Sequence, residues 1–507
     1  MDLSILMSHR RRNSTAYVIG LILIGLGIGM IPCLLSSMIH EESLSPFLAP
    51  VVLCLVIGTS VDLLFRMPDI IRPVDGLVMV AAMWVVAIAV GSIPFMLAGM
   101  PPVDAIFEST SGITTTGSTI MADIESWPYG ILLWRSVMQW IGGIAIIIIF
   151  MMILPMLGFG GRDLFGNETS GSGAVNFSIK MRDAAKQFIV IYLILTVILL
   201  VILLLLGVNI YEGLCLSLST VSTGGFMCKG DSVIGYRSLV KVAVMIFMFL
   251  GGTNFYLHFK AVYRADLEGY TKNEEFRTML LLNIGFIIFA FLIVCGWQIN
   301  FTQEEMYRLV DVGFNIVSAS TTTGFAAADY DAWMPTAVML MFVAMLIGGS
   351  SGSTSGGLKI GRLLVTVRFA YNGLKEMLHP RAVYDIRLNG SSLDSNTIYS
   401  AVTVFIVFFV TVIIGAAVLM LSGMDFQLAM TTMVANLTTF GPATGPFGAV
   451  GSYQDLQWFI KLFLSVVMWL GRLEILTGLI LLTPGFWKEY MMSRRKQGSP
   501  AAARIRR

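Results

Sequence analysis

Four short polar strings that end in glycine interrupt the long apolar stretches of this chain, and they are the segments best suited to chemistry. They read TTTG at Thr114–Gly117, VSTG at Val221–Gly224, TTTG at Thr321–Gly324 and TTFG at Thr438–Gly441. Glycine takes positive φ without a Cβ clash, and hydroxyl side chains both donate and accept hydrogen bonds. Rings of backbone carbonyls replace the hydration shell of an ion in potassium-type selectivity filters. The strings therefore indicate cation coordination.

Each string belongs to a longer unit that recurs four times. A short, semi-apolar segment precedes every string, and a second small-residue signature follows 24 to 30 residues after the glycine, at Gly142, Gly251, Gly348 and Gly471. Two signatures that recur in phase indicate internal repeats. The unit reads as a span, a short helix, a polar loop and a second span, and two further helices precede the first copy.

The elements that must position these loops are membrane spans. The chain has 507 residues, of which 56% are hydrophobic and 13% charged, whereas soluble domains carry about 25% charged residues. Apolar stretches long enough to cross a hydrocarbon core of about 30 Å recur throughout. We expect ten spans, at residues 16–37, 46–66, 76–98, 130–155, 187–207, 237–262, 277–297, 335–371 with an interruption, 397–421 and 456–482.

Irregular backbone at membrane depth is tolerated only where it is buried in protein or lines a watery cavity. Four polar loops, one per repeat, can satisfy this condition by meeting around a single axis with their carbonyls facing one another. The short helix before each loop would then aim its partly negative carboxyl end at the axis, which also suits a cation.

The third repeat carries an elongated loop, GGSSGSTSGGLK, at Gly348–Lys359. Its five glycines and five serines or threonines between Gly348 and Gly357 disfavour a regular helix. The alternative is a helix-packing surface of small residues. The other repeats have only GG or GR at this point, and asymmetry in one quarter of a pore suits a gate. A phosphate-cradling loop is disfavoured because Lys359 lacks the G-K-[ST] context.

Arg472 lies within the last span, where an arginine is costly and marks an ion path or a buried pair. It stands at the GG position of the other repeats, so it is expected to face the axis and act as an electrostatic barrier. The alternative is a buried ion pair, for which Glu474 is the nearest candidate by sequence.

Charge divides the two faces of the membrane. Most of the 33 Lys and Arg residues lie in loops on one side, together with both termini, and this side is expected to be cytoplasmic. The first apolar segment is read as an uncleaved helix rather than a signal peptide, and the basic tail as a disordered segment that touches anionic lipid. The opposite side is acidic and would steer cations inward, with an ordinary solvated face as the alternative.

Several charged residues fall on the outer side. The acids there include Asp104, Glu108 and Asp311. Arg135, near Trp134 and Trp140, is read as an interfacial anchor, with bracing of a filter loop as the alternative. The remaining outer cations are read as surface or interfacial residues: Lys229, Arg237, Lys241, Arg308 and Lys461.

Enzymatic and redox functions are disfavoured. The five cysteines form no C-x-x-C pair and the four histidines form no H-E-x-x-H pair, so neither a disulfide framework nor a metal site is expected. The serine-rich GGSSGS string invites an intramembrane serine protease. However, His258 and His379 are expected at cytoplasmic span ends, away from it.

The repeated units resemble the Trk/Ktr/HKT superfamily of cation transporters, and the leading two-helix extension resembles its bacterial TrkH/TrkG branch rather than KtrB. The strings that carry the resemblance are STSGITTTGS, LSTVSTGGF, ASTTTGF, GGSSGSTSGGLK and MWLGRLEI, and it covers essentially the whole chain. It implies an all-α polytopic fold with four pseudo-repeats around one pore. The expected domains are an extension (1–70), four repeats (71–160, 161–265, 266–375 and 376–490) and a basic cytoplasmic tail (491–507).

The resemblance also implies roles for individual residues. The filter carbonyls would come from Thr114, Thr115, Thr116, Gly117, Val221, Ser222, Thr223, Gly224, Thr321, Thr322, Thr323, Gly324, Thr438, Thr439, Phe440 and Gly441, with one signature glycine per loop. The gate would comprise an intramembrane loop and a pore arginine, with Gly348, Gly349, Gly352, Gly356, Gly357, Lys359 and Arg472 as its residues.

The resemblance further implies a non-enzymatic homodimer in the bacterial inner membrane. It implies K⁺ as the permeant ion without a cofactor, a cytoplasmic nucleotide-binding regulatory subunit similar to TrkA, and no nucleic-acid partner. The second loop, VSTG, and Phe440 in the fourth depart from the TTTG pattern. A Na⁺-permeable or Na⁺/H⁺-coupled transporter on the same scaffold therefore stays open as the alternative.

Overall fold

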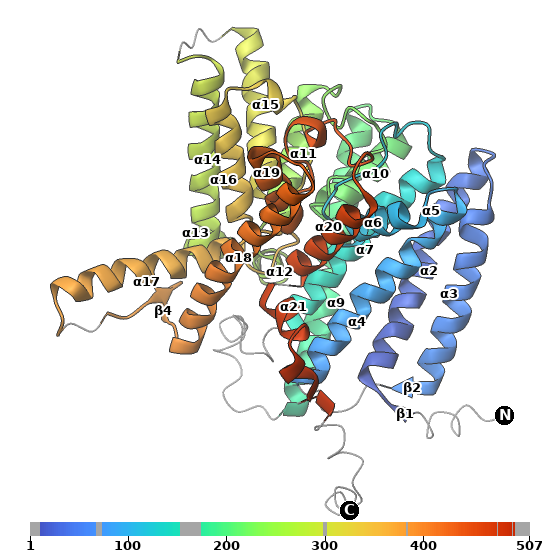
Figure 1. Ribbon diagram of the computed structural model, residues 1–507, viewed down its shortest axis with the longest axis horizontal. Coiled ribbons are helices and arrows are strands. Elements are labelled where there is room, and N and C mark those ends of the chain that lie inside the picture. Colours follow the sequence, from blue (N-terminus) through green and yellow to red (C-terminus); the bar gives the residue numbers. More distant parts are fainter. Residues whose placement is uncertain are drawn as a thin grey trace, which may run out of the picture.

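The computed structural model describes residues 11–66, 73–152, 174–297, 302–381, 384–473, 475–488 and 490–491. Two helices come first, α2 (Ser14–Ile39) and α3 (Ser45–Leu64), and they lie side by side at one edge of the molecule (Figure 1). Their polar ends are joined by a parallel pair of two-residue strands, β1 (Arg11–Arg12) and β2 (Phe65–Arg66). These two helices form the expected extension.

The first two repeats follow the predicted order of span, short helix, loop and span. The first contains α4 (Pro73–Gly91), α5 (Ile93–Leu97), the short helix α6 (Pro102–Ile113) and α7 (Tyr129–Met152). The second contains α9 (Ala174–Leu205), the short helix α10 (Ile210–Val221), α11 (Ser238–Gly251) and α12 (Phe255–Arg264). α9 begins well before residue 187, where its span was expected to begin.

The third and fourth repeats repeat this order with additions at one end. The third contains α13 (Glu268–Lys272), α14 (Glu274–Val294), α15 (Gln303–Ser320), α16 (Pro335–Ile347) and α17 (Ile360–Leu378). An antiparallel hairpin of β3 (Arg387–Leu388) and β4 (Ser391–Ser392) leads into the fourth. This contains α18 (Ser395–Leu421), α19 (Phe426–Leu437), α20 (Trp458–Arg472) and α21 (Ile475–Leu481). Short 3-10 turns follow the third and fourth loops, at Tyr330–Ala332 and Gly445–Phe447.

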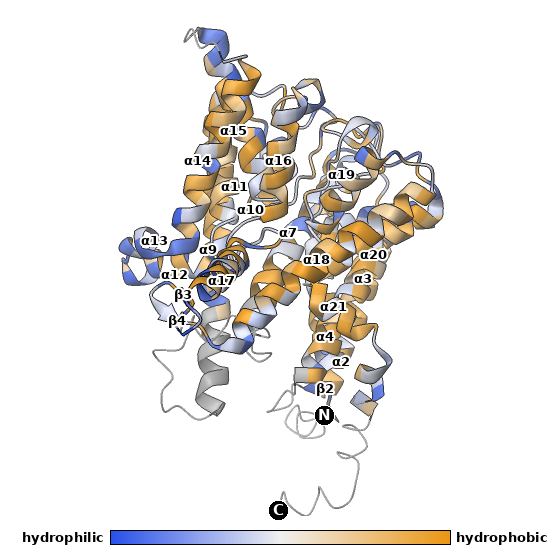
Figure 2. Ribbon diagram, turned by 60° about the vertical axis from the view of Figure 1, so that its left-hand side comes forward, coloured by the Kyte–Doolittle hydropathy of each residue, from blue (hydrophilic) through white to orange (hydrophobic). Residues whose placement is uncertain are grey.

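Within the described residues, seven helices are long and apolar enough to cross a membrane, and two bent pairs add to them. One pair, α11 and α12, bends by 96° at residues 252–254, and α20 with α21 forms the other. The expected interrupted span at 335–371 is divided between α16 and α17. Figure 2 shows that the spans are hydrophobic along most of their length. The predicted all-α polytopic fold is confirmed, with the two small strand pairs as additions.

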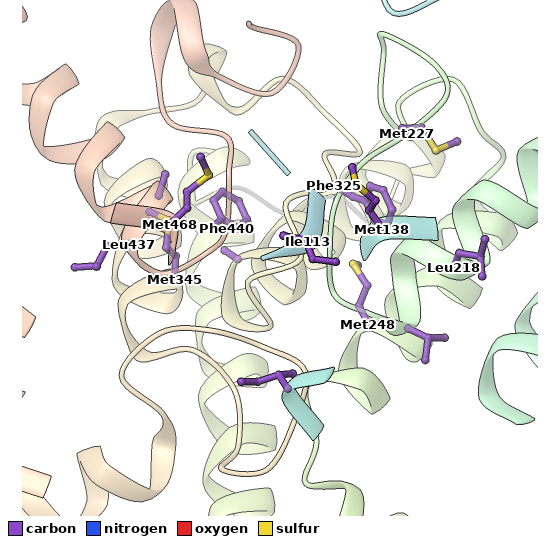
Figure 3. Packing of buried hydrophobic residues seen from close by; sticks show 14 of the residues in the cluster. Ile113, Met138, Leu218, Met227, Met248, Phe325, Met345, Leu437, Phe440 and Met468 are labelled. Atoms are coloured by element: carbon purple, nitrogen blue, oxygen red, sulfur yellow. The ribbon is translucent and has the colours of Figure 1, made fainter. Parts of the chain in front are cut away.

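The short helices lie inside the molecule although they are rich in polar residues. In α6 the residues from Phe107 to Ile113 are all buried, and α10, α15 and α19 are buried over corresponding stretches. Side chains from all four repeats, among them Ile113, Met248, Phe325 and Phe440, gather around the loops (Figure 3). The spans therefore enclose four polar loops within a shared apolar core.

Candidate functional site

The four short helices end in the same way. The second residue beyond each helix is a buried threonine in the left-handed region, with φ between 51° and 56°, namely Thr115, Thr223, Thr322 and Thr439. The amide of the residue after it donates back into the helix at 2.8–2.9 Å, as from Thr116 to the Ser111 carbonyl. This resembles the Schellman motif, which normally uses glycine. A threonine there costs about 1–2 kcal/mol, and such strain clusters at functional sites.

The shared helix ends correct the register expected for the second loop. Because α10 ends at Val221, this residue belongs to the helix and the loop is Ser222–Gly225. Gly225 has φ of 84°, which matches the values of 86°, 91° and 96° at Gly117, Gly324 and Gly441. The expectation that Gly224 is the signature glycine is therefore wrong by one residue. Gly224 instead takes the position of Thr116, Thr323 and Phe440 in the other loops.

The four loops close into a ring. A Cβ on Gly117 would lie 2.5 Å from the Gly224 carbonyl oxygen, and a Cβ on Gly225 would lie 2.2 Å from that of Thr323. In the same way, a Cβ on Gly324 would lie 2.2 Å from the Phe440 carbonyl oxygen, and a Cβ on Gly441 would lie 2.4 Å from that of Thr116. Each signature glycine thus lies against the carbonyl of the next loop, and the fourth returns to the first. No side chain fits at any of these positions.

The first and third loops are braced by their own threonines. The hydroxyls of Thr114 and Thr116 are hydrogen-bonded at 2.8 Å, and those of Thr321 and Thr323 at the same distance. These two loops share the sequence TTTG, and each is supported by the same hydrogen bond between its first and third threonines.

The second loop lacks such a pair and is braced by Gln139 of α7. Gln139 Nε2 donates to the Gly224 carbonyl at 2.6 Å, while its Oε1 accepts from the Phe226 amide at 3.0 Å and from the Ser219 hydroxyl. A Cβ on Gly224 would collide with this side chain. In the fourth loop, the Gly441 carbonyl accepts from the Tyr453 hydroxyl at 2.8 Å. The ring is therefore not four-fold identical in its hydrogen bonds.

The elongated loop of the third repeat lies against the ring. The Gly356 amide donates to the Thr322 hydroxyl at 2.6 Å, and the Thr223 hydroxyl donates to that of Thr354 at 3.1 Å. A Cβ on Gly356 would lie 2.0 Å from the Thr438 carbonyl oxygen. Since α16 ends at Ile347 and α17 begins at Ile360, the intervening segment is not a helix. The alternative of a helix-packing surface is therefore wrong.

The same loop is bonded to the break between α11 and α12. The Ser350 amide donates to the Gly252 carbonyl at 2.9 Å, the Thr354 amide to the Gly251 carbonyl at 3.2 Å, and the Phe255 amide to the Gly352 carbonyl at 3.1 Å. The broken helix leaves carbonyls without intrahelical partners, and the elongated loop satisfies two of them.

Both ends of this loop have backbone that only glycine adopts easily. Gly348 has φ of 72° and ψ of −167°, and Lys359 has φ of 72° and ψ of 133°. The chain therefore turns sharply at Gly348 and again at Lys359, and Gly352 and Gly357 also have positive φ. Gly349 packs closely, because a Cβ there would lie 2.2 Å from the Ser355 hydroxyl.

Arg472 ends α20, directly beside the elongated loop. Its side chain is buried, and Nη1 donates to the Thr354 carbonyl at 2.7 Å while Nη2 lies 3.5 Å from the Gly142 carbonyl. Within the described part of the chain, its hydrogen bonds are thus to carbonyls and not to carboxylates. Glu474, the partner that the sequence suggested, lies outside the described residues. Arg472 links the fourth repeat to the loop of the third and to the first repeat.

Arg135 braces a loop and is not an interfacial anchor. It is 1% exposed, and its Nε donates to Oε1 of the fully buried Glu108 at 2.7 Å. It also donates to the Met227 carbonyl at 2.9 Å and lies 4.1 Å from the Phe226 ring centroid. Arg135 therefore joins the short helix of the first repeat to the segment after the second loop. The expectation that Glu108 belongs to a solvated acidic face is wrong.

Two further outer cations are also buried and cross between repeats. Lys241 of α11 donates to Asp311 of α15 at 2.7 Å, and Lys461 of α20 donates to Asp104 of α6 at 2.6 Å. Their assignment to the surface is wrong, because both side chains are buried. The paired acid from the neighbouring repeat compensates for burying each positive charge. Lys229 pairs with Glu212 and is half-buried. Arg237 and Arg308 are exposed, so the expected surface position is confirmed for these two residues.

A pattern in the sequence could have revealed these pairs. An acid stands nine residues before the end of the short helix in the first three repeats, namely Asp104, Glu212 and Asp311. A lysine stands ten residues before the small-residue signature in the second and fourth repeats, namely Lys241 and Lys461. Pairs of opposite charge at fixed points of a repeat indicate contacts between repeats.

Comparisons with known proteins agree with this architecture. The family model TrkH, described as a cation transport protein, matches residues 44–487. The Trk system potassium uptake protein TrkH of Halomonas elongata is 32% identical over 93% of this chain and 98% of that protein. TrkG of Escherichia coli K12, also named a Trk system potassium uptake protein, is 28% identical over 91% of this chain and 96% of its own length.

A solved structure matches as well. The crystal structure of the potassium transporter TrkH from Vibrio parahaemolyticus superimposes with a TM-score of 0.84 at 30% identity, covering 94% of this chain and 99% of that one. The family match, the relatives and the shared fold all extend over nearly the whole length. The chain is therefore a multi-pass membrane protein that belongs to the TrkH family of cation transport proteins.

Proposed function

We propose that this protein takes up potassium across the bacterial inner membrane through the ring of four loops. The observation that carries the proposal is the closed ring itself, in which each signature glycine lies against a carbonyl of the next loop. The filter would consist of Thr114–Gly117, Ser222–Gly225, Thr321–Gly324 and Thr438–Gly441. Relatives that are named potassium uptake proteins support K⁺ as the permeant ion.

The chemistry follows from the backbone. A K⁺ ion that enters such a ring exchanges water oxygens for carbonyl oxygens. The amides of the loops are turned back into the helix ends, as at Thr116 and Thr323, so they do not compete for the ion. The carboxyl ends of four short helices add negative potential at the same place. The left-handed threonines hold the backbone in the conformation that this arrangement needs.

Cavities on the two sides of the elongated loop support a conduction path. One of about 50 Å³ is lined by Gly117, Gly225 and Gly324 on the acidic side of the ring. Another of about 40 Å³ is lined by Ser355, Gly356 and Arg472 on the other side. The ring and the elongated loop that lies against it stand between them, so the elongated loop would have to move for an ion to pass. We assign it the role of gate, with Gly348 and Lys359 as hinges.

Arg472 would act twice in this gate. Its charge opposes a cation in the adjacent cavity, and its hydrogen bond to the Thr354 carbonyl holds the loop in place. Opening therefore requires this bond to break. A cytoplasmic nucleotide-binding subunit would supply the energy that opens the gate. The protein would act as a homodimer, with both termini of each chain in the cytoplasm.

A second candidate is transport in which Na⁺ also passes, or is coupled to K⁺. The unequal ring favours it, because Gln139 and Tyr453 engage carbonyls in the second and fourth loops but Thr–Thr pairs support the first and third. A carbonyl that is already hydrogen-bonded offers less of its charge to an ion.

The purified protein in liposomes separates these functions. We expect K⁺ flux that exceeds Na⁺ flux, increased by the cytoplasmic subunit and nucleotide, and growth of a K⁺-uptake-deficient host at low K⁺. Equal fluxes of the two ions would favour the second candidate. Absence of flux of either ion, in protein that elutes as a folded species, would contradict both.

A further inference from the structure

A cavity of about 380 Å³ opens beside the gate on the basic side of the molecule. Its walls come from the first half of α12, from α13, from the starts of α14, α17 and α18, and from the β3–β4 hairpin. The labels of α12, α13, α17 and the hairpin lie close together in Figure 2. Sites for small ligands typically measure about 300–1,000 Å³. The volume therefore suits a small organic ligand rather than a bare ion.

The charged lining favours an anion. Four cationic side chains line the cavity against two acidic ones, namely Lys260, Lys272, Lys359 and Arg362 against Asp266 and Glu275. Both carboxylates already accept from backbone amides, Asp266 from Gly269 at 3.0 Å and Glu275 from Ser351 at 2.8 Å. Lys272 is also paired with Glu268, and the cations still outnumber the acids, so the cavity carries a net positive charge. Asparagine and hydroxyl side chains are among its other polar groups. Phosphate matches guanidinium and ammonium groups by charge and hydrogen bonding.

The cavity is coupled to the gate through Glu275. This residue is buried, and its bond to the Ser351 amide holds the middle of the elongated loop. Lys359 and Arg362 lie close enough for their charges to stabilise the Glu275 carboxylate. Lys359 also ends the gate loop at a strained backbone position and donates to the Ser355 carbonyl. An anion that draws on these two cations would therefore weaken the hold of Glu275 on the loop.

The far wall of the cavity is tied to the same helix end. Glu274 pairs with Arg368 of α17 at 2.6 Å, and its amide donates to the Asn389 side chain of the hairpin at 2.8 Å. Neighbouring acids at the start of α14 thus hold both the gate loop and the helix that follows it. Movement of α17 would change the cavity and the gate together.

We propose that this cavity binds a phosphate-bearing anion and that its occupancy is transmitted to the gate through Lys359, Arg362 and Glu275. The identity of the gate in this inference rests on the proposed function, whereas binding of the anion to the cavity does not depend on that function. Two sources share this chemistry: a free phosphorylated small molecule and the headgroup of an anionic phospholipid at the membrane surface. The cavity lies at the ends of α14 and α18 on the basic side of the molecule, where both have access.

Binding is tested on the full-length protein in nanodiscs of phosphatidylcholine. We expect inorganic pyrophosphate to raise Tm by about 3 °C at saturation. Lys260→Gln and Arg362→Gln should abolish the shift, whereas Lys260→Arg and the control Lys375→Gln, on the same helix α17 but outside the cavity, should retain it. If only nanodiscs with phosphatidylglycerol raise Tm, and the same two variants abolish it, the ligand is the lipid headgroup.

A Tm that neither pyrophosphate nor phosphatidylglycerol changes would overturn the proposal, and so would a shift that is equal in all variants. Coupling is tested by Glu275→Gln, which keeps the cavity but weakens the charge link. We expect it to retain the shift in Tm while K⁺ flux loses its response to the anion. Because Tm does not depend on flux, a protein that binds the anion but conducts no K⁺ contradicts the proposed function alone.

Discussion

Gln139 donates a hydrogen bond to the Gly224 carbonyl at 2.6 Å, and this contact replaces a side chain that the second loop lacks. The other three loops have a side chain at the position of Gly224, namely Thr116, Thr323 and Phe440. Three residues before the small-residue signature, the first repeat has Gln139, whereas the second has Met248. The glutamine and the glycine therefore form a matched pair across two repeats.

Substitution of Gln139 by Met should reduce ion selectivity. It leaves the Gly224 carbonyl and the Phe226 amide without their partner, and a typical hydrogen bond contributes about 1 kcal/mol. We expect the K⁺/Na⁺ permeability ratio to fall about five- to tenfold, measured from reversal potentials in planar bilayers. Met248→Leu is the matched control and should leave the ratio unchanged. An unaltered ratio in Gln139→Met would show that the brace does not shape the filter.

Substitution of Arg472 by Ala should increase K⁺ flux. The change removes both a buried positive charge and the hydrogen bond to the Thr354 carbonyl of the elongated loop, the proposed gate. A repulsion of even 1.4 kcal/mol corresponds to a tenfold change, so we expect a rise of about tenfold or more. Arg472→Lys keeps the charge and should keep most of the barrier. Liposome flux that is the same in wild-type and Arg472→Ala protein would contradict the barrier role.

Substitution of Arg135 by Met should destabilise the protein. Glu108 would remain buried without its cation, and breaking a buried ion pair in this way costs about 3–5 kcal/mol. We expect a clear fall in Tm in detergent and loss of the contact to the Met227 carbonyl. Adding Glu108→Gln removes the stranded charge and should restore part of the Tm. No recovery in the double variant would show that the two residues do not act as a pair.

The sequence allowed the repeat, the four loops and the break between α16 and α17 to be predicted, because each leaves a local pattern. Polar strings between spans recur in phase, and ten glycine and hydroxyl residues in a row cannot form a stable helix. Partnerships between repeats were not predicted in the same way. Lys461 and Asp104 are 357 residues apart, and only the closure of the ring brings the fourth repeat against the first.

The register of the second loop was missed for a different reason. VSTGG holds two adjacent glycines, and either can serve as the signature residue unless the end of the preceding helix is known. A valine at the helix end and a serine after it carry no strong stop signal. The left-handed threonine decides the register, and its conformation is visible only in the structure.

This register leads to a prediction that distinguishes the two glycines. Alanine at Gly225 would need left-handed backbone and would place its Cβ 2.2 Å from the Thr323 carbonyl oxygen, which is backbone and cannot yield. Alanine at Gly224 would instead collide with the Gln139 side chain. We therefore expect Gly225→Ala to abolish K⁺ flux in every background, whereas the loss of flux in Gly224→Ala should be relieved when Gln139→Ala is added. Size-exclusion profiles control for folding. Conduction by Gly225→Ala, with a silent Gly224→Ala/Gln139→Ala double variant, would return the signature position to Gly224.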